Sequence, residues 1–536
     1  MLGIERLLQK LLNRQNQPKS ERKDFEEEFD IKTKYVHGLL FYNSYFDYVL
    51  KALDKYTVCF IVGGWIRDRL LNRPLGKKID VDFVVTTKPI DIVKKLKNIL
   101  GKGDIFQFEK EKDVATIIFS EGDVKYRFDF SYLNIDDIMF NKNLDFYDKE
   151  KKIIERIEED LLTRDFTINA MAIVFDDAVG LGASQTVLFD PSNGLEDLQM
   201  GIVRPISFEN IEKDPVRILR GYRIAQQLDL EIVKEFEDWI KKNKSIIQQS
   251  PKERIRDELL KIFDGKESPE TIRKLAEVGI LEQIIPLITE AKRKKIHLDI
   301  NKETLLEHSL KTLFYTEKFL DDKGFLASFI DIELLKQLDK NTFLGEFSDT
   351  TLLKLSAFFH DVGRLKEDKV SVERHQELSK EVFLNDIAPN IALGEKASKF
   401  VAELIGKHLE VWKLYLLHSE GSLTNKDKNL FWYKNKNIAL HLFILTLADT
   451  KATFGDKYHF EKVKEFIIYL QAYYFDVYQK EIVDEPLLTG KEIMEILNLK
   501  PSKLVGEIKD KLLEYQLEGK IKTKEEAIEF IKKAFG

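Results

Sequence analysis

The sequence is poor in cysteine and in long apolar runs. Cys59 is the single cysteine among 536 residues, which excludes an internal disulfide framework and a zinc site built from several cysteines. The best apolar run, Ala439–Ala448, contains His441 and is shorter than the roughly 18 apolar residues of a membrane span. The N-terminal segment lacks the apolar core of a secretory signal. These absences predict a cytoplasmic protein that has no membrane partner.

Proline and glycine are also scarce, at 12 and 26 residues, and no low-complexity run marks a linker. The length predicts roughly three or four domains, and 43% hydrophobic with 33% charged residues indicates a globular protein. The net charge of −7 excludes a uniformly basic nucleic-acid-binding protein but not a local basic surface. Residues 241–256 hold six basic side chains and one acidic one, and residues 292–295 are all basic. Each segment alone is also typical of a solvated helix face.

The local pattern changes twice along the chain. Residues 1–55 alternate charged and apolar clusters and are expected to be helical. From Val58, short β-branched and aromatic runs such as VCFIVGG and VDFVVTT indicate strands, with helical patterns between them. After Asp214 the apolar residues recur at the helical period. We therefore predict an α+β fold in which a strand-containing part at 56–180 precedes a mostly helical remainder.

A pair of glycines follows the first predicted strand, in FIVGGWIRD. Gly63 and Gly64 lie just before a predicted helix, where backbone N–H groups and the helix N-terminus favour a phosphate. Arg67 follows one turn later and could meet a triphosphate. A tight turn also needs glycine, so the pair alone leaves both interpretations open.

Two aspartates stand two residues apart in the apolar strand KKIDVDFVV. The period of two places Asp80 and Asp82 on one face, where adjacent carboxylates favour Mg²⁺ shared with substrate phosphates. The alternative is an edge strand with a solvated acidic face. Asp129, in YRFDFSYL, is a candidate third carboxylate, or else a surface acid paired with Arg127.

Longer blocks resemble one family. GGWIRD, EEDLLTRDFTINAMAI, LFDPSNGLEDLQMGIVRPI and EKDPVRILRGYRIAQQLDLEI follow in the order of the class II tRNA nucleotidyltransferases. That family includes CCA-adding enzymes, CC- and A-adding specialists and bacterial poly(A) polymerases. The resemblance implies a polymerase-β-like nucleotidyltransferase head, a small mixed sheet with helices, followed by a helical neck, body and tail.

The resemblance also implies roles for individual residues. Asp80 and Asp82 would be the catalytic ligands of Mg²⁺, and Asp214 and Arg217 would select CTP or ATP through the edge of the incoming base. The remaining residues would bind the nucleotide: Gly63, Gly64, Arg67, Arg164, Arg220 and Arg223. From spacing alone, the arginines that recur every three residues from Arg217 could also form a solvated charged face.

Two positions depart from the family pattern: Lys213 replaces a glutamate before Asp214, and Thr163 replaces the first arginine of the RRD element. The loss of the glutamate bears on how Arg217 is held. The segment from Asp129 to Asp160 is long enough for the loop that A addition requires. We therefore expect addition of C, C and A to the 3′ end of tRNA from CTP and ATP. The alternatives are CC-only or A-only addition, or poly(A) synthesis.

A histidine-rich region at 300–455 resembles the HD phosphohydrolases. FFHDVGR supplies His360 and Asp361, LADTKA supplies Asp449, and His308 precedes them; RHQELS adds His375, and His408 follows. The resemblance implies a metal site of His308, His360, Asp361 and Asp449, and imidazole with carboxylate suits Ni²⁺, Mn²⁺ or Zn²⁺. Four other histidines are expected to be packing or surface residues: His297, His418, His441 and His459. An HD phosphohydrolase with an RNA-binding head is the alternative of a different class.

These expectations divide the chain into five parts. They are an N-terminal helical extension (1–55), the head (56–180), a neck and body with the base-selecting residues and RNA contacts (181–299), the HD domain (300–455) and a tRNA-binding helical tail (456–536). The expected partners are the acceptor stem and elbow of tRNA, recognised by shape.

Overall fold

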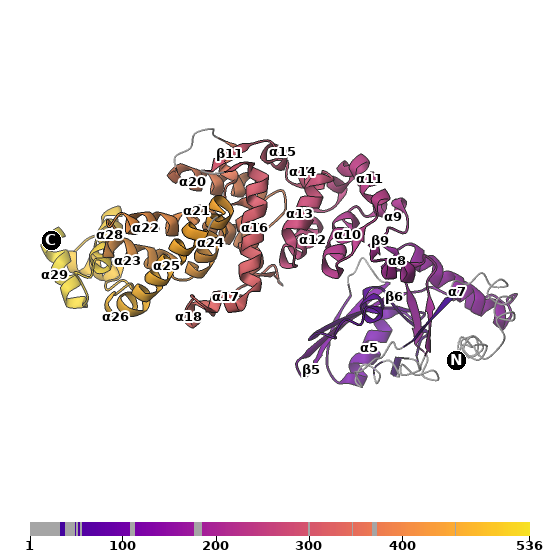
Figure 1. Ribbon diagram of the computed structural model, residues 1–536. Coiled ribbons are helices and arrows are strands. Elements are labelled where there is room, and N and C mark those ends of the chain that lie inside the picture. The colour runs from indigo at the N-terminus through magenta and orange to yellow at the C-terminus, as the bar shows by residue number, and fades with distance from the viewer. Residues whose placement is uncertain are drawn as a thin grey trace. The chain divides into compact units, whose positions relative to one another are not determined.

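The computed structural model describes residues 33–37, 49, 52–53, 56–107, 113–175, 185–298, 301–345, 347–366, 372–455 and 457–536. The chain divides into two compact units, Met1–Ile240 and Lys241–Gly536. Figure 1 shows the sheet in the first unit and helices throughout the second.

The first unit contains a mixed sheet whose eight described strands follow the order β1-β8-β7-β2-β3-β6-β5-β4. β3 and β6 run parallel, whereas the other described neighbours run antiparallel. The strands are β1 (Thr33–His37), β2 (Cys59–Val62), β3 (Lys78–Val85), β4 (Asp104–Phe106), β5 (Val114–Glu121), β6 (Val124–Tyr132), β7 (Ala172–Phe175) and β8 (Gln185–Phe189). The predicted α+β class with a small mixed sheet is confirmed.

Apolar side chains on both faces of the sheet fix the helices that cover it. Phe83 of β3 stacks on Phe130 of β6 at 4.8 Å between ring centroids, and α5 (Pro89–Leu100) packs on β4, β5 and β6. Phe60 and Val62 of β2 share a second cluster with buried residues of α7 (Phe146–Leu162). The other helical elements of this unit are α4 (Gly64–Leu70), α6 (Asp136–Met139), η2 (Thr167–Asn169), α8 (Gly194–Met200), α9 (Phe208–Lys213), α10 (Arg217–Leu228) and α11 (Lys234–Asn243), the last continuing into the second unit.

The expected helical extension over 1–55 is wrong for Thr33–His37, which form β1 and pair with β8. The charged and apolar alternation of this segment fits a strand as well as a helix, and pairing with a distant strand decides between them. Most of residues 1–55 lie outside the described residues. β8 itself lies beyond residue 180, so the sheet continues past the position where the sequence predicts the head to end.

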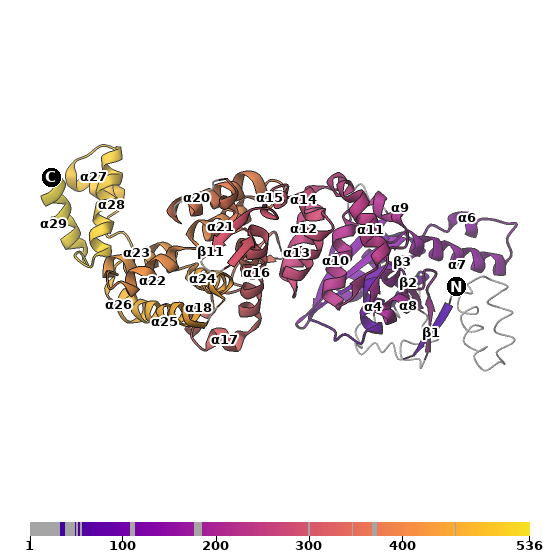
Figure 2. The same ribbon diagram turned by 45° about the horizontal axis from the view of Figure 1, so that its top comes forward.

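The second unit is built from helices around α16 (Leu305–Asp321), α19 (Asp349–Phe359), α21 (Glu395–Lys407) and α24 (Ala439–Phe454), which pack on one another. α24 is buried along most of its length, which explains its apolar sequence. Figure 2 shows α27 (Gly490–Leu497), α28 (Lys503–Leu517) and α29 (Lys524–Phe535) grouped together, and these three helices have their own apolar core. None of the described helices has the length and apolarity that crossing a membrane requires.

The remaining elements of this unit connect and flank those helices. They are η3 (Lys244–Gln249), α12 (Lys252–Asp264), α13 (Ser268–Glu277), α14 (Ile280–Ile284), α15 (Ile288–Ala291), β11 (Lys295–Leu298), β12 (Asn301–Thr304), α17 (Lys323–Ala327), α18 (Ile332–Leu335), β13 (Thr342–Phe343), β14 (Phe347–Ser348), η4 (Val362–Leu365), α20 (Val372–Val382), η5 (Phe383–Ile387), α22 (Glu410–Ser419), α23 (Asn425–Asn435), α25 (Lys457–Tyr473), η6 (Tyr474–Tyr478) and α26 (Gln479–Glu481).

Gly194, the first residue of α8, is required by close packing. A Cβ at this position would lie 2.0 Å from the carbonyl oxygen of Thr167. We expect Gly194→Ala to lower the free energy of unfolding by about 3 kcal/mol, because the backbone of η2 must move away. Thermal unfolding followed by circular dichroism measures the change.

Gly506→Ala is the matched control. Gly506 lies inside α28, and a Cβ there would meet nothing within 4 Å. It should raise stability by about 0.5–1 kcal/mol, because alanine favours the helix. Equal effects of the two substitutions would contradict this packing argument.

Candidate active site and metal centre

The parallel pair of strands β3 and β6 brings three carboxylates together. Asp80 and Asp82 are exposed on one face of β3, while Ile79 and Val81, which alternate with them along the strand, are buried. The register places Asp129 of β6 directly opposite Asp82. The predicted common face of Asp80 and Asp82 is therefore present, and Asp129 is their neighbour.

Asp129 is also paired locally. Its carboxylate accepts a hydrogen bond from the Thr116 hydroxyl and another from Nε of Arg127 at 2.9 Å. The geometry is therefore compatible with both predictions for Asp129, because its carboxylate pairs with Arg127 and also lies beside Asp82. Its role as a third metal ligand stays a prediction.

The electrostatics of Asp82 fit a divalent cation. Partial desolvation by the surrounding protein raises the pKa of its carboxyl, Arg164 opposes this, and the negative charges of Asp129 and Asp80 raise it further. Carboxylates that repel one another in this way gain most from a hard dication. The oxygen-only donor set therefore fits Mg²⁺.

The glycine turn meets the same carboxylate. Gly63 has φ +78°, and a Cβ there would lie 3.0 Å from Oδ2 of Asp82 and 3.4 Å from Nη1 of Arg164. Arg164 in turn pairs with Asp160 on α7 at 3.2 Å. Three motifs that are far apart in the sequence thus converge: the glycine pair, the aspartate strand and the segment after α7.

Arg67 is buried rather than extended into solvent. It donates hydrogen bonds to Oδ1 of Asn169 at 2.6 Å and to Oδ1 of Asp68. Its guanidinium lies beside Gly64, where a Cβ would come within 3.3 Å of Nη2. Both predicted phosphate-binding residues therefore lie together at the start of α4.

A buried acid that the sequence analysis did not single out links these residues to α10. Asp165 accepts hydrogen bonds from Asn169 and, at 3.1 Å, from Arg220 of α10. Desolvation would raise the pKa of this carboxyl, but Arg220 and then Asn169 outweigh it and lower the pKa. Arg67, Asn169, Asp165 and Arg220 form one continuous polar network. The signal for Asp165 and Asn169 is their place inside the block EEDLLTRDFTINAMAI.

The proposed base-selecting residues stand at the junction of α9 and α10. Asp214 caps α9, and its carboxylate lies 3.6 Å from Nε of Arg217. Nη1 of Arg217 donates to the backbone carbonyls of Thr163 and Asn210, each at 3.1 Å. Lys213 is exposed. Arg217 is thus held by backbone oxygens, and the anchor needs no particular side chain at 163.

Arg223 differs from the other arginines of α10. It donates to Oε1 of Gln227, one turn further along the helix, at 2.8 Å. Arg220 contacts Asp165, and Arg217 contacts the end of α7. The arginines that the spacing predicts on one face of the helix therefore bind different partners.

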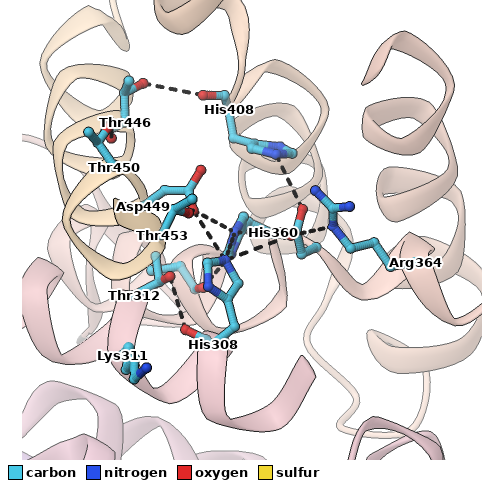
Figure 3. A network of polar contacts seen from close by, with 12 residues as sticks. His308, Lys311, Thr312, His360, Arg364, His408, Thr446, Asp449, Thr450 and Thr453 are labelled. Carbon is cyan, nitrogen blue, oxygen red and sulfur yellow. Dashed lines mark hydrogen bonds and ion pairs between the residues drawn. The ribbon is translucent and has the colours of Figure 1, made fainter. Parts of the chain in front are cut away.

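In the second unit, three helices bring two buried histidines and a partly exposed aspartate into one cluster. Nε2 of His308 lies 3.2 Å from Nε2 of His360 and 3.1 Å from Oδ1 of Asp449. Nε2 of His360 lies 3.5 Å from the same oxygen. Figure 3 shows these three side chains pointing toward one another from α16, the end of α19 and α24.

Asp361 joins this group to two further histidines. Its Oδ2 lies 3.7 Å from Nε2 of His308 and 3.8 Å from Nε2 of His360, while its Oδ1 lies 2.7 Å from Nε2 of His375. His408 approaches Oδ1 at 3.6 Å. Arg364 pairs with Oδ2. Desolvation raises the pKa of this buried carboxyl, but Arg364 and then His360 outweigh it and hold the pKa well below its usual value.

The imidazoles are oriented by their second nitrogens. Nδ1 of His360 donates to the carbonyl of Ala357 at 2.8 Å, and Nδ1 of His408 donates to that of Ile405 at 2.7 Å. Such bonds leave each Nε2 directed into the cluster as a ligand atom. Nδ1 of His308 faces Glu303, a partner that the sequence analysis missed. The buried nitrogen and carboxylate donors fit Ni²⁺, Mn²⁺ or Zn²⁺.

The side chains of three other histidines lie outside this cluster. His441 is buried beside Asp349, at 3.7 Å. His418 stacks on Tyr469, and His459 stacks on Phe454. His297 lies on β11.

Comparisons with known proteins agree with this geometry. Residues 59–204 match the model "Poly A polymerase head domain", residues 229–292 match "Probable RNA and SrmB- binding site of polymerase A", and residues 305–453 match "HD domain". The CC-adding tRNA nucleotidyltransferase of Thermus thermophilus is 24% identical over 88% of this chain and 92% of its own. The chain is a nucleotidyltransferase of the CCA-adding family.

Other relatives differ in their reported product. The CC-adding enzyme of Synechocystis is 23% identical to this nucleotidyltransferase, over 88% of this chain and 92% of its own. A CCA-adding enzyme of Listeria monocytogenes is 27% identical over 47% of this chain and 58% of its own.

Two solved structures share the fold. The apo form of a CCA-adding enzyme has a TM-score of 0.56 at 20% identity and covers 91% of this chain and 93% of its own. The Thermotoga maritima CCA-adding enzyme complexed with tRNA has a TM-score of 0.51 at 19% identity, over 92% and 95%.

The pH dependence of metal binding tests the histidine cluster. Burial lowers the pKa of His308, but hydrogen bonds to Asp449 and Glu303 outweigh it and raise the pKa to about 9. A metal must displace this proton. We expect Ni²⁺ affinity of the metal-free protein to rise about tenfold per pH unit between pH 7 and 9, then level off.

Isothermal titration calorimetry in buffers of different ionisation enthalpy measures this affinity and the protons released. His308→Gln should abolish the slope. A wild-type affinity that is independent of pH in this range would contradict the protonated state.

Proposed function

We propose that this nucleotidyltransferase adds C, C and A to tRNA 3′ ends from CTP and ATP, without a nucleic-acid template. The proposal rests on one observation: Gly63, Asp82 and Arg164 lie together, where the glycine turn meets strand β3. A phosphate-accommodating turn, acidic residues suited to a dication and an arginine are the groups that nucleotide transfer requires. Solved proteins of this fold include a CCA-adding enzyme complexed with tRNA.

In this proposal Asp80 and Asp82 hold Mg²⁺, with Asp129 beside them. Bound Mg²⁺ lowers the pKa of an attacking hydroxyl and stabilises the charge of the pyrophosphate leaving group. Gly63 keeps the space next to Asp82 clear, because any Cβ would crowd its carboxylate. Arg164, positioned by Asp160, supplies positive charge to the same place.

Base choice rests on Asp214 and Arg217. An arginine offers a rigid fork of donors and an aspartate offers acceptors, so the pair can reward C or A and leave the groups of U or G unpaired. Two backbone carbonyls hold one arm of Arg217. The guanidinium therefore enters nucleotide binding already oriented, which reduces the entropy lost on binding.

Addition of CC alone is the second candidate, and one observation favours it. The Thermus and Synechocystis relatives, both CC-adding, each align with 88% of the chain. The segment between Asp129 and Asp160 favours complete CCA addition instead, because it is long enough for the loop that A addition requires. It includes α6 and most of α7.

An incorporation assay distinguishes these candidates. Labelled CTP, ATP or both are supplied with Mg²⁺ to tRNA transcripts that end at the discriminator base or at CC. Two C followed by one A supports the proposal, and C alone supports the second candidate. A alone identifies an A-adding enzyme, and a long A tail identifies a poly(A) polymerase.

For tRNA we propose that basic residues of the second unit contact the acceptor stem and elbow. Lys252 and Arg254 of α12 and Lys241 are exposed. Lys252 donates to the carbonyl of Pro389 at 3.3 Å and stays exposed, whereas Lys292, in the second basic segment, pairs with Glu282 and is only partly exposed. The first segment is therefore the better candidate for phosphate contacts.

We further propose that the HD domain is a metal-dependent phosphohydrolase whose metal is held by His308, His360, Asp361 and Asp449. The convergence of His308, His360 and Asp449 within 3.5 Å of one another supports this. Hydrolysis of phosphate esters at this site would be independent of the head.

Removal of the head carboxylates tests the catalytic assignment. We expect Asp80→Asn with Asp82→Asn to lower kcat about a thousandfold or more, because several kcal/mol of charge stabilisation are lost. Asp123→Asn, in the exposed turn of the same sheet, is the control and should leave kcat unchanged. Single-turnover incorporation measures both, and full incorporation by the double variant would contradict the catalytic role of these carboxylates.

Base selectivity tests Arg217. We expect Arg217→Ala to lower kcat/KM for CTP at least about tenfold and to reduce discrimination against UTP, because a directed donor pair is lost. Arg156→Ala, which removes an arginine of α7 paired with Asp137, is the control. Unchanged discrimination against UTP in Arg217→Ala would remove this residue from base selection.

A further inference from the structure

We propose that Asn210 is a positioning residue that holds Arg164 and Arg217 in a fixed relation to each other. Its side chain binds the backbone segment 162–164, which lies between the end of α7 and the buried Asp165. This role rests on the proposed function of the two arginines, one at the metal end of the site and one at the base end. It adds a residue that acts through both.

The side-chain amide of Asn210 binds two backbone carbonyls. Asn210 lies on α9 and is 6% exposed. Its Nδ2 donates to the carbonyl of Leu162 at 2.7 Å and to that of Arg164 at 2.9 Å. Both partners are acceptors, so the NH₂ group and not the amide oxygen must face them. Asparagine therefore serves here through its two donors, which alanine and an ionised aspartate lack.

The carbonyls that Asn210 binds belong to a helix end. α7 ends at Leu162, and the last carbonyls of a helix have no partner within that helix. Asn210 binds the carbonyls of residues 162 and 164, and Nη1 of Arg217 binds the carbonyl between them, at Thr163. Residues of α9 and α10 therefore hold three consecutive carbonyls of this segment.

Asn210 also holds Arg217 directly. Its own backbone carbonyl accepts a hydrogen bond from Nη1 of Arg217 at 3.1 Å. Its N–H donates to the hydroxyl of Ser207, the N-cap of α9. Asn210 thus supplies one of the two carbonyls that bind Nη1, and through its side chain it places the other, that of Thr163.

Arg164 lies at the other end of the same segment. Asn210 binds its carbonyl, and Nη1 of its guanidinium lies, like Oδ2 of Asp82, within 3.4 Å of the Cβ position of Gly63. A shift of the backbone at 162–164 therefore moves Arg164 relative to Asp82 and moves the anchor of Arg217 at the same time. Loss of the side chain of Asn210 should affect both ends of the site.

Steady-state incorporation tests this role. The nucleotide preference is the ratio of kcat/KM for CTP over UTP, or for ATP over GTP on a tRNA transcript that ends at CC. We expect Asn210→Ala to lower kcat about fivefold, because Arg164 is displaced, and to lower the nucleotide preference about tenfold, because Arg217 is displaced. In an Arg217→Ala background, Asn210→Ala should lower the preference by less than about twofold, because the residue through which it acts is absent.

Two further variants separate positioning from general destabilisation. Asn210→Asp keeps the shape of the side chain and removes its donors, so it should lower the preference at least as far as Asn210→Ala. Asn429→Ala is the matched control, because Asn429 is 2% exposed and donates to the carbonyl of Leu517 at 2.7 Å in the second unit. It should lose stability and keep the preference of the wild type. Circular dichroism verifies that each variant is folded.

Each contrary result has its own meaning. An unchanged preference in folded Asn210→Ala and Asn210→Asp, when Arg217→Ala has lost it, overturns the role of Asn210 and leaves the proposed function of Arg217 intact. An unchanged preference in all three variants overturns both. Full additivity of Asn210→Ala with Arg217→Ala, or an unchanged kcat in Asn210→Ala, overturns the shared hold on the two arginines. A loss of preference in Asn429→Ala as large as in Asn210→Ala overturns it as well, because destabilisation alone then explains the effect.

Discussion

The buried ion pair between Asp165 and Arg220 organises the first unit. Asp165 is buried, so its charge depends on the partners that surround it: Arg220, Asn169 and the N–H of Phe166. Through Asn169 the pair reaches Arg67 beside the glycine turn, and through Arg220 it reaches α10, which begins at Arg217. The glycine turn and α10 are therefore held to each other through this buried charge, and a displacement of either one leaves an unpaired buried carboxylate.

The local parts of the site follow from sequence period and motif. The spacing of Asp80 and Asp82 in an apolar strand requires a common face, and the structure has it. The alignment of Asp129 with Asp82 does not follow, because it depends on a parallel pairing of β3 with β6 that no local pattern specifies. The same limit applies to Thr33–His37, where pairing with β8 and not local propensity determines the strand.

In the histidine cluster, too, one part of the site follows from the sequence and another part depends on the fold. Motifs place His308, His360, Asp361 and Asp449 in one domain, and their meeting follows from the fold that those motifs imply. The orientation of each imidazole depends on carbonyls such as those of Ala357 and Ile405 at helix ends, which any residue supplies. Sequence therefore identifies ligand types more readily than it identifies which nitrogen faces inward.

The anchoring of Arg217 has an evolutionary consequence. Its guanidinium is fixed by the carbonyl oxygens of Thr163 and Asn210, and a carbonyl oxygen belongs to the backbone of every amino acid. Selection at position 163 therefore acts on the path of the main chain and hardly on the identity of the residue. A threonine at position 163 therefore serves this anchor as well as any other residue whose carbonyl follows the same path.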